Sequence, residues 1–304
     1  MTQLLTIRLL RTLMTLFGVL VLAFSLGRFT GDPAAMMMPL DATDADIERA
    51  RRQLGLDKSL PEQFIIYTGA ILRGDFGNSI AQQRPAFDLV MNRAPASIRL
   101  GLLAFIISVA LGIPAGMLAA YQRSRFADSL LMSLSLAAQS LPSFFLGIAL
   151  ILIFSVQLGL TPSFGDDTWR HYILPVATLS AYSLAIVIRM TRSSVLEVMN
   201  HDYVRTARAK GLHERRVRNV HMLRNALIPV VTLLGLQFGS ILSGSAVIET
   251  VFAWPGMGSL AVGAVSQRDF PVIQTVVLLS AFAFSIANFA VDLLYIWLDP
   301  RIRL

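Results

Sequence analysis

Few side chains in this sequence have the types and spacing that catalysis requires. Lys58 and Lys210 are its two lysines, and neither stands in the G-x-x-x-x-G-K-[ST] pattern that cradles nucleotide phosphates. The chain has no cysteine, so thiol catalysis, disulfides and thiolate-bound metals are excluded. We therefore expect a chain that is not an enzyme and that binds no ATP, metal or other cofactor itself.

The histidines and serines give no stronger sign of chemistry. His171, His201, His213 and His221 match no metal-binding spacing, and we expect interfacial histidines without a metal role. No G-x-S-x-G elbow marks a serine nucleophile. A membrane enzyme stays open as an alternative with weak support.

An ion-coupled carrier usually places carboxylates near the middle of the membrane. Here Asp292 lies toward the inner end of the last apolar segment, and Glu249 and Asp128 lie at segment ends. A structural hydrogen bond or an ion pair with Arg301 explains Asp292 better than a proton path does. A secondary transporter driven by an ion gradient remains an alternative without visible coupling groups.

The composition predicts a polytopic helical membrane protein. Hydrophobic residues make up 55% of the 304 positions and charged residues 15%, against about 25% charged in soluble domains. So few polar side chains could not cover the surface of a soluble fold. The net charge of +7 is explained by arginines at helix ends, and without aromatic-interleaved basic repeats we expect no nucleic-acid partner.

Six apolar segments are long enough to cross a bilayer, which requires about 20 helical residues. They lie near residues 9–29, 98–120, 129–157, 172–190, 228–249 and 272–298. Pro142 interrupts the third, where a freed carbonyl predicts a kink that faces protein or a water-filled path. The predicted fold class is all-α, with six transmembrane helices.

Arginines concentrate in alternate connections between these segments. The run before the first segment, the 191–227 loop and the C-terminus are rich in them, whereas the short opposite loops are not. The positive-inside rule then predicts a multi-pass inner-membrane protein with both termini in the cytoplasm. The first segment also resembles a signal peptide, but no small-x-small cleavage site follows it, so we expect it to stay uncleaved.

The large loop of residues 30–97 is expected to form an ordered extracytoplasmic cap. Residues 44–54 and 61–73 have helical spacing, ended by Gly55 and Gly74, and Gly74-Asp75-Phe76-Gly77-Asn78-Ser79 is rich in turn residues. A short helix is also expected over 259–267, and Trp254 suits a membrane–water interface. The predicted parts are 1–29, the loop domain 30–97 and a membrane core 98–304 that includes the cytoplasmic loop 191–227.

A solute path would be lined by neutral polar residues of the middle segments. Small and hydroxyl residues within spans more often serve helix packing, so each candidate has that alternative. The candidates are Gln139, Ser140, Pro142, Ser183, Gln237, Ser240 and Ser243.

A polar, arginine-rich run of residues 202–212 lies between two long apolar segments. Asn200 or Asp202 can cap a short helix there, and Gly211 provides a left-handed stop. Val204 and Ala207 share a small face that could dock in a groove of a partner, ringed by basic side chains. The alternative is an amphipathic helix held by anionic lipid. The run reads Asp202, Tyr203, Val204, Arg205, Thr206, Ala207, Arg208, Ala209, Lys210, Gly211 and Leu212.

This run, with Arg224-Asn225-Ala226-Leu227-Ile228-Pro229 after it, resembles the "EAA" loop of ABC importer permeases. More narrowly, it is similar to the dipeptide, oligopeptide and nickel permease family. Arg205-Thr206-Ala207 stands where the broad pattern has Glu-Ala-Ala. Further markers are Gly31-Asp32-Pro33, Leu54-Gly55-Leu56-Asp57, the 74–79 turn, Glu249-Thr250-Val251-Phe252 and Pro255-Gly256-Met257-Gly258.

The resemblance implies a six-span subunit that pairs with a second, homologous permease. Two cytoplasmic ATPases would bind beneath it, with ATP on those subunits, and an extracytoplasmic binding protein would deliver the solute. Residues 202–212 would be the coupling helix in an ATPase groove, and the cargo would be a short peptide or peptide-like solute. Nickel or another small solute remains an alternative cargo.

Overall fold

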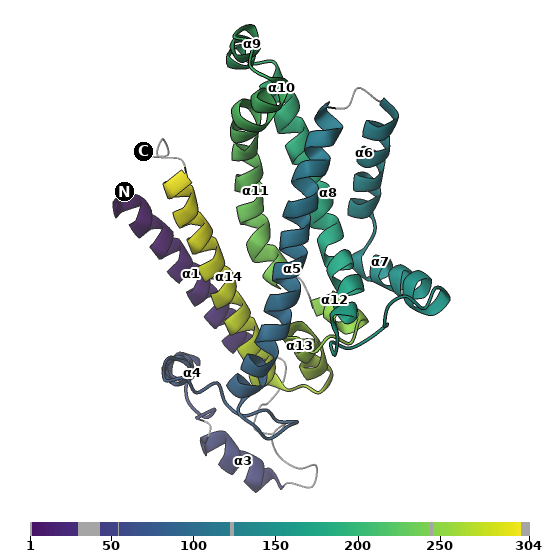
Figure 1. Ribbon diagram of the computed structural model, residues 1–304. Coiled ribbons are helices and arrows are strands. Elements are labelled where there is room, and N and C mark those ends of the chain that lie inside the picture. Colours follow the sequence, from purple (N-terminus) through teal and green to yellow (C-terminus); the bar gives the residue numbers. More distant parts are fainter. Residues whose placement is uncertain (1, 30–42, 54, 122–124, 244–245, 299–304) are drawn as a thin grey trace. The chain divides into compact units, whose positions relative to one another are not determined.

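The computed structural model describes residues 2–29, 43–53, 55–121, 125–243 and 246–298, which are mostly helical (Figure 1). The chain forms two compact units, one of Met1–Pro95 with Gly256–Phe289 and one of Ala96–Pro255 with Ala290–Leu304. The long helices α5 (Ala86–Tyr121) and α14 (Phe270–Leu298) contribute to both units. The three-part division at residues 29 and 97 stays a prediction, since these units are groups of contacting residues.

The first unit contains α1 (Thr2–Phe29), α3 (Asp44–Gln53), α4 (Leu60–Leu72) and α13 (Met257–Ser266). Its core joins the start of α5 to α13 and α14 through buried residues that include Val90, Ala264 and Val272. Asp269 is buried and accepts hydrogen bonds from the backbone N–H groups of Ile80 (3.1 Å) and Ala81 (3.3 Å) and from the Ser79 hydroxyl. This carboxylate ties the turn before α5 to the connection between α13 and α14.

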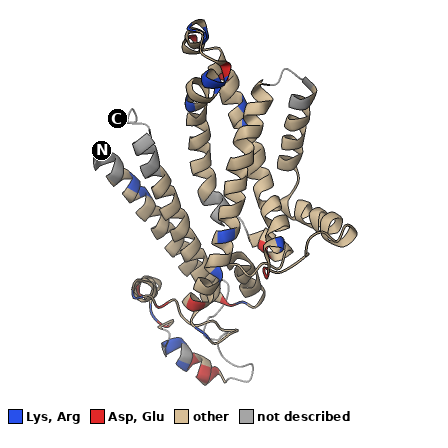
Figure 2. Cartoon of the chain, in the orientation of Figure 1, with Lys and Arg blue, Asp and Glu red and all other residues tan. Residues whose placement is uncertain are grey.

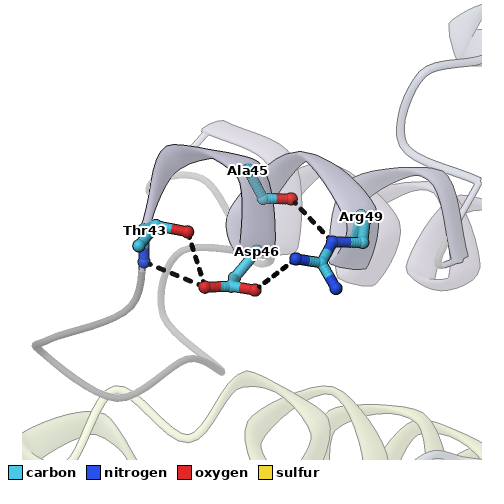
Figure 3. A network of polar contacts seen from close by, with 4 residues as sticks. All are labelled: Thr43, Ala45, Asp46 and Arg49. Atoms are coloured by element: carbon cyan, nitrogen blue, oxygen red, sulfur yellow. Dashed lines mark hydrogen bonds and ion pairs between the residues drawn. The ribbon is translucent and has the colours of Figure 1, made fainter.

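The start of α3 is fixed by the carboxylate of Asp46 (Figure 3). It accepts hydrogen bonds from the Thr43 hydroxyl (2.6 Å) and N–H (3.2 Å), and Arg49 pairs with its other oxygen at 2.9 Å. The bonds from Thr43 lower the pKa of Asp46. The carboxylate also lies near the positive end of the helix dipole, which stabilises the first turn.

Both helices predicted in the 30–97 loop are present. α4 begins with a capping box in which Glu62 accepts hydrogen bonds from the Ser59 N–H (3.1 Å) and hydroxyl (3.0 Å). Gly55 (φ +65°) and Gly74 (φ +83°) adopt the left-handed conformation that ends a helix. The short helix expected at 259–267 corresponds to α13. α5 begins at Ala86, twelve residues before the predicted span, so the end of the loop is helical.

The second unit adds α6 (Arg125–Ser140), α7 (Ser143–Leu150), α8 (Ile173–Met199), α9 (Asp202–Ala209), α10 (Glu214–Arg216), α11 (Leu223–Ser243) and α12 (Ala246–Val251). A π-helical segment, Ile151–Gln157, continues α7, and another, Val217–Met222, joins α10 to α11. Gly112 and Gly116 let α5 approach α8 closely: a Cβ on Gly116 would lie 2.6 Å from the Ile188 carbonyl oxygen. Backbone contact of this kind is typical of packed membrane helices.

Among the described residues, five single helices are long and apolar enough to span a membrane: Thr6–Arg28, Ala86–Tyr121, Trp169–Met199, Glu214–Phe238 and Phe270–Val291. The third predicted span is a bent pair instead, Ser129–Ser140 and Ser143–Gln157, with 109° between the helices. The expected kink is thus confirmed, and it is sharp enough to make two helices of one segment. Pro142 causes it, since its nitrogen cannot donate to the preceding turn.

The segment predicted at 228–249 also differs, since α11 ends at Ser243 and α12 is a separate helix. Glu249, expected at a segment end, is fully buried, and its carboxylate accepts a 2.6 Å hydrogen bond from Ser97. Trp254, expected at a membrane–water interface, is buried within the protein, and its Nε1 donates to the Ala96 carbonyl at 3.1 Å. Gly31-Asp32-Pro33, Arg301 and the Asp292 side chain lie outside the described residues.

Candidate functional site: a charged helix and a cavity among the spans

The polar run forms the helix α9, whose ends are defined by its own backbone. His201 is the N-cap residue (ψ 148°), not Asn200 or Asp202, and its side chain makes no capping hydrogen bond. Asp202 in the first turn complements the helix dipole. At the other end Gly211 has φ +73°, and the N–H of Leu212 reaches the Ala207 carbonyl at 3.3 Å. This is a Schellman stop, as the glycine predicted.

The face expected to dock in a partner is turned into the protein. Val204 is fully buried and Ala207 nearly so. They share a core with the ends of the neighbouring helices, and Tyr203 and Leu212 pack against it. The other buried members are Ala120 of α5, Val195 and Val198 of α8, Val217 and Met222 of the π-helical segment, and Ala226 of α11. A partner can therefore contact only the opposite face of α9, where Arg205, Thr206, Arg208, Ala209 and Lys210 are exposed.

Charge is concentrated at this end of the second unit (Figure 2). Arg208 holds Glu214 through two hydrogen bonds, Nη2 to Oε1 at 2.8 Å and Nε to Oε2 at 3.2 Å. The hydrogen bond to the Glu214 carboxylate raises the pKa of Arg208 above its usual value, so the guanidinium stays charged. Arg218 stacks 5.1 Å from the centre of the Tyr121 ring. The first contact joins α9 to α10, and the second joins the π-helical segment Val217–Met222 to α5.

A cavity of about 360 Å³ opens among α6, α7, α8, α11 and α12. Three of the predicted path residues, Gln139, Ser183 and Gln237, lie on its wall. The Ser183 hydroxyl donates to Oε1 of Gln237, so α8 and α11 are joined at the cavity. The remaining wall is mostly apolar, with leucine, isoleucine and alanine side chains. The cavity could take a neutral or zwitterionic solute through a few hydrogen bonds.

Arg189 of α8 sets the orientation of Gln139. Its Nη1 donates to Oε1 of Gln139 at 2.9 Å, which leaves the amide nitrogen Nε2 as the free end of that side chain. Nε2 is buried and has no hydrogen-bond partner. Gln139 therefore offers an unsatisfied donor to an acceptor such as a carbonyl or carboxylate oxygen of a solute.

Of the other predicted path residues, Ser140 and Pro142 do not line this wall. The Ser140 hydroxyl donates to the Leu136 carbonyl of its own helix at 2.9 Å, and Pro142 starts α7 at the bend. Ser240 and Ser243 belong to α11, but their side chains lie outside the described residues. Pro142 thus shapes the cavity through the bend that it causes.

Three residues of the cavity region were missed from the sequence. Thr178 and Tyr182 line the wall with Ser183, and Arg189 contacts Gln139. The i, i+4, i+5 spacing of Thr178, Tyr182 and Ser183 on one helix face was a usable signal. An arginine at the end of an apolar segment was a second signal, because charged residues in spans usually face protein or water.

Two family comparisons cover nearly the whole sequence. Residues 112–304 match the family described as binding-protein-dependent transport system inner membrane component, and residues 1–101 match its N-terminal family. The glutathione transport system permease protein GsiC of Escherichia coli K12 is 46% identical over 297 residues, which is 97% of each chain. GsiC of Shigella boydii is 45% identical over the same length.

Solved structures of more distant proteins share the fold. An inward-facing structure of the MetNI methionine ABC transporter aligns with a TM-score of 0.58 at 20% identity, covering 69% of this chain and 96% of that one. An amino acid ABC transporter with histidines aligns with a TM-score of 0.53 at 17% identity, covering 71% and 94%. Such a permease works with ATPase and solute-binding partners. The chain belongs to the family of binding-protein-dependent transport system inner membrane components, as a multi-pass inner-membrane permease subunit of an ATP-driven importer.

Proposed function

We propose that this permease forms the path for short peptides or peptide-like solutes. Its relatives named GsiC are glutathione permeases, and glutathione is a peptide-like molecule with several carbonyl and carboxylate acceptors. The donor of Gln139 on a neutral, mostly apolar wall suits such acceptors, because it can bind them without a fixed counter-charge at its tip. The path residues in this proposal are Gln139, Ser183 and Gln237, with Thr178 and Tyr182 beside them.

ATP hydrolysis is proposed to take place on separate subunits. We infer that this chain hydrolyses no ATP and binds no nucleotide, because its two lysines stand outside any phosphate-cradling pattern. Two ATPases would bind beneath the permeases, one of them with α9 in its groove, and a second, homologous permease would complete the path. Both termini and α9 would then face the cytoplasm, as the distribution of arginine between loops favours.

The observation that carries the coupling role is the division of α9 into two faces. Val204 and Ala207 are built into the core at the ends of α5, α8 and α11, whereas the opposite face is exposed and basic. A force on the exposed face would reach those three spans together, because the buried face cannot slide without opening the core. ATP-driven closure of the ATPases would thereby change the access of the cavity from one side of the membrane to the other.

The test is reconstitution with and without the partners. The chain with its companion permease, both ATPases and the binding protein should accumulate radiolabelled glutathione or dipeptides in vesicles only when ATP is supplied. Uphill uptake by this chain alone, driven by an ion gradient, would refute the proposal. Strict dependence on ATP together with indifference to peptides would refute only the cargo.

A further inference from the structure

The helix α4 is too short to span a membrane, and one of its exposed faces is too apolar for contact with water. Its 13 residues fall short of the about 20 that cross a bilayer. Yet Ile65 and Leu72, two turns apart on one face, are 69% and 82% exposed. Gln63 and Tyr67 lie on the other side of the helix, toward α1. An exposed apolar face on a helix that cannot span is typical of a helix lying in a membrane interface.

Contacts with α1 place α4 at membrane depth. The Phe64 ring lies 5.4 Å from that of Phe24 and 6.0 Å from that of Phe17. Phe17 lies well inside the apolar segment Thr6–Arg28, so α4 is beside the end of the span rather than beyond it. Figure 1 shows α4 along its axis and α1 lengthwise, so α4 crosses α1 steeply.

A cavity of about 260 Å³ opens where α4 meets the ends of α1 and α14. Arg28, on its wall, donates through Nε to Oε1 of Gln63 at 2.8 Å. Gln63 is held in turn by donating to the carbonyls of Leu56 and Lys58, at 3.1 and 2.9 Å. In the described part of the chain no carboxylate lies within ion-pair distance of Arg28. The guanidinium also lies over the Phe24 ring, 5.1 Å from its centre, and its remaining N–H groups are donors for an anion in the cavity.

Tyr67 supplies a second donor to the cavity. Its hydroxyl is buried without a hydrogen-bond partner, and burial raises its pKa to about 12, so the proton stays in place. The wall also carries the exposed carboxylate of Asp75, whose Oδ1 accepts a hydrogen bond from the Gly77 N–H at 3.0 Å. Cation, hydroxyl and carboxylate together complement a ligand that has both a phosphate and an ammonium group.

We propose that α4 lies in the outer leaflet and that this cavity binds the headgroup of an aminophospholipid. The phosphate would contact Arg28 and Tyr67, and the ammonium would contact Asp75. A zwitterionic peptide shares this chemistry, but the apolar face of Ile65 and Leu72 favours the lipid, whose acyl chains would cover it. The assignment to the outer leaflet rests on the membrane orientation proposed above. The headgroup site does not depend on that orientation.

The absence of cysteine makes the position of α4 directly measurable by spin labels. Ile65→Cys and Leu72→Cys would be labelled in the assembled transporter in vesicles of phosphatidylethanolamine and phosphatidylglycerol, with Arg52→Cys on α3 as the water-exposed control. We expect high collision rates with oxygen and low rates with a nickel chelate at Ile65 and Leu72. Low rates with both reagents would mean that the second permease covers the face. High collision rates with the nickel chelate would mean that the labelled face of α4 is exposed to water. Either of these two results would overturn the proposal.

The headgroup is tested by native mass spectrometry of the detergent-purified complex with added lipid. Phosphatidylethanolamine should be retained in preference to phosphatidylcholine and phosphatidylglycerol, and Arg28→Ala should reduce retention by about tenfold, as expected for a charged hydrogen bond. Arg73→Ala, which removes an exposed cation at the end of α4, should change nothing. Tyr67→Phe removes only the hydroxyl and should also reduce the retention of phosphatidylethanolamine. This variant tests the headgroup site if Arg28→Ala fails to assemble.

Equal retention by wild type, Arg28→Ala and Tyr67→Phe would overturn the headgroup site, as would a preference for phosphatidylglycerol. Displacement of the lipid by a dipeptide at this cavity would assign the site to cargo and also count against the proposal. None of these outcomes depends on which ATPases drive transport. Loss of ATP-dependent uptake with intact lipid retention would instead refute the proposed function alone.

Discussion

Arg208 and Glu214 form a two-bonded ion pair that joins the end of α9 to the start of α10. We expect Arg208→Glu to abolish transport while the protein remains in the membrane, because the pair becomes a repulsion beside the proposed ATPase contact surface. The double variant Arg208→Glu, Glu214→Arg should recover much of the uptake. Uptake in vesicles, with membrane abundance measured by immunoblot, checks this. Full activity of the single variant would contradict a coupling role for this end of α9.

Gly211 is predicted to tolerate only residues that accept a left-handed backbone. Gly211→Pro should abolish transport, because proline fixes φ near −65° and lacks the N–H that bonds to the Arg208 carbonyl at 2.9 Å. Gly211→Ala should cost about 1 kcal/mol of stability and part of the uptake. Gly211→Asn is the matched control and should stay near wild type. ATPase activity that persists without transport in Gly211→Pro would locate the defect in coupling.

Arg189→Met should weaken solute binding through Gln139. Without its partner the amide of Gln139 can turn its oxygen to the cavity, and we expect KM for peptide uptake to rise by about tenfold with kcat little changed. Gln139→Glu should act more strongly on peptides with a free carboxylate than on amidated ones. An unchanged KM in both variants would remove this wall of the cavity from the path.

The close approach of α5 and α8 depends on Gly116. A Cβ there would lie 2.6 Å from both the Ile188 carbonyl oxygen and the Thr191 Cβ, so Gly116→Ala should destabilise the protein by about 1–3 kcal/mol. Gly18→Ala in α1 is the control, because nothing lies within 4 Å of the added methyl. Thermal unfolding in detergent, followed by size-exclusion chromatography, should separate the two variants. Equal melting temperatures would argue against this packing.

The first turn of α4 should lose protection in acid. Hydrogen bonds from Ser59 lower the pKa of Glu62 in the folded protein. The stabilisation is therefore complete above the unfolded pKa of about 4.3 and is lost as pH falls through the lower folded pKa. Hydrogen-exchange protection factors for the first turn should fall at such pH in wild type. They should change less in Glu62→Gln, which keeps the acceptor but does not titrate.

Much of the fold could be predicted from local sequence. Apolar length gave the five single spans, and the glycines at 55, 74 and 211 gave helix ends, because φ above zero is a local property. The angle of the bend at Pro142 could not be predicted from local sequence. Beyond the bend α7 packs against α12 and Phe252, and a Cβ added at Gly147 would lie 3.2 Å from Phe252 and 3.3 Å from Val251.

The candidate site was predicted in part. Residue type singled out Gln139, Ser183 and Gln237, but their pairing needs contacts across 50 residues for Gln139 with Arg189 and 54 for Ser183 with Gln237. The inward turn of Val204 and Ala207 was missed because a short amphipathic helix has the same pattern whether its own protein or a partner covers the apolar face. Only the positions of the neighbouring helices decide between the two.

The two sides of α9 can be engineered independently. Changes at Val204 or Ala207 must fit a core shared by three spans, whereas Arg205, Thr206 and Ala209 are exposed, and the contacts of Arg205 and Thr206 are with Asp202 on the same helix. A transplant of only the exposed residues from a related permease should therefore transfer its choice of ATPase without rebuilding the scaffold. Hybrid transporters that use the ATPase of another system could then be built to take up new solutes.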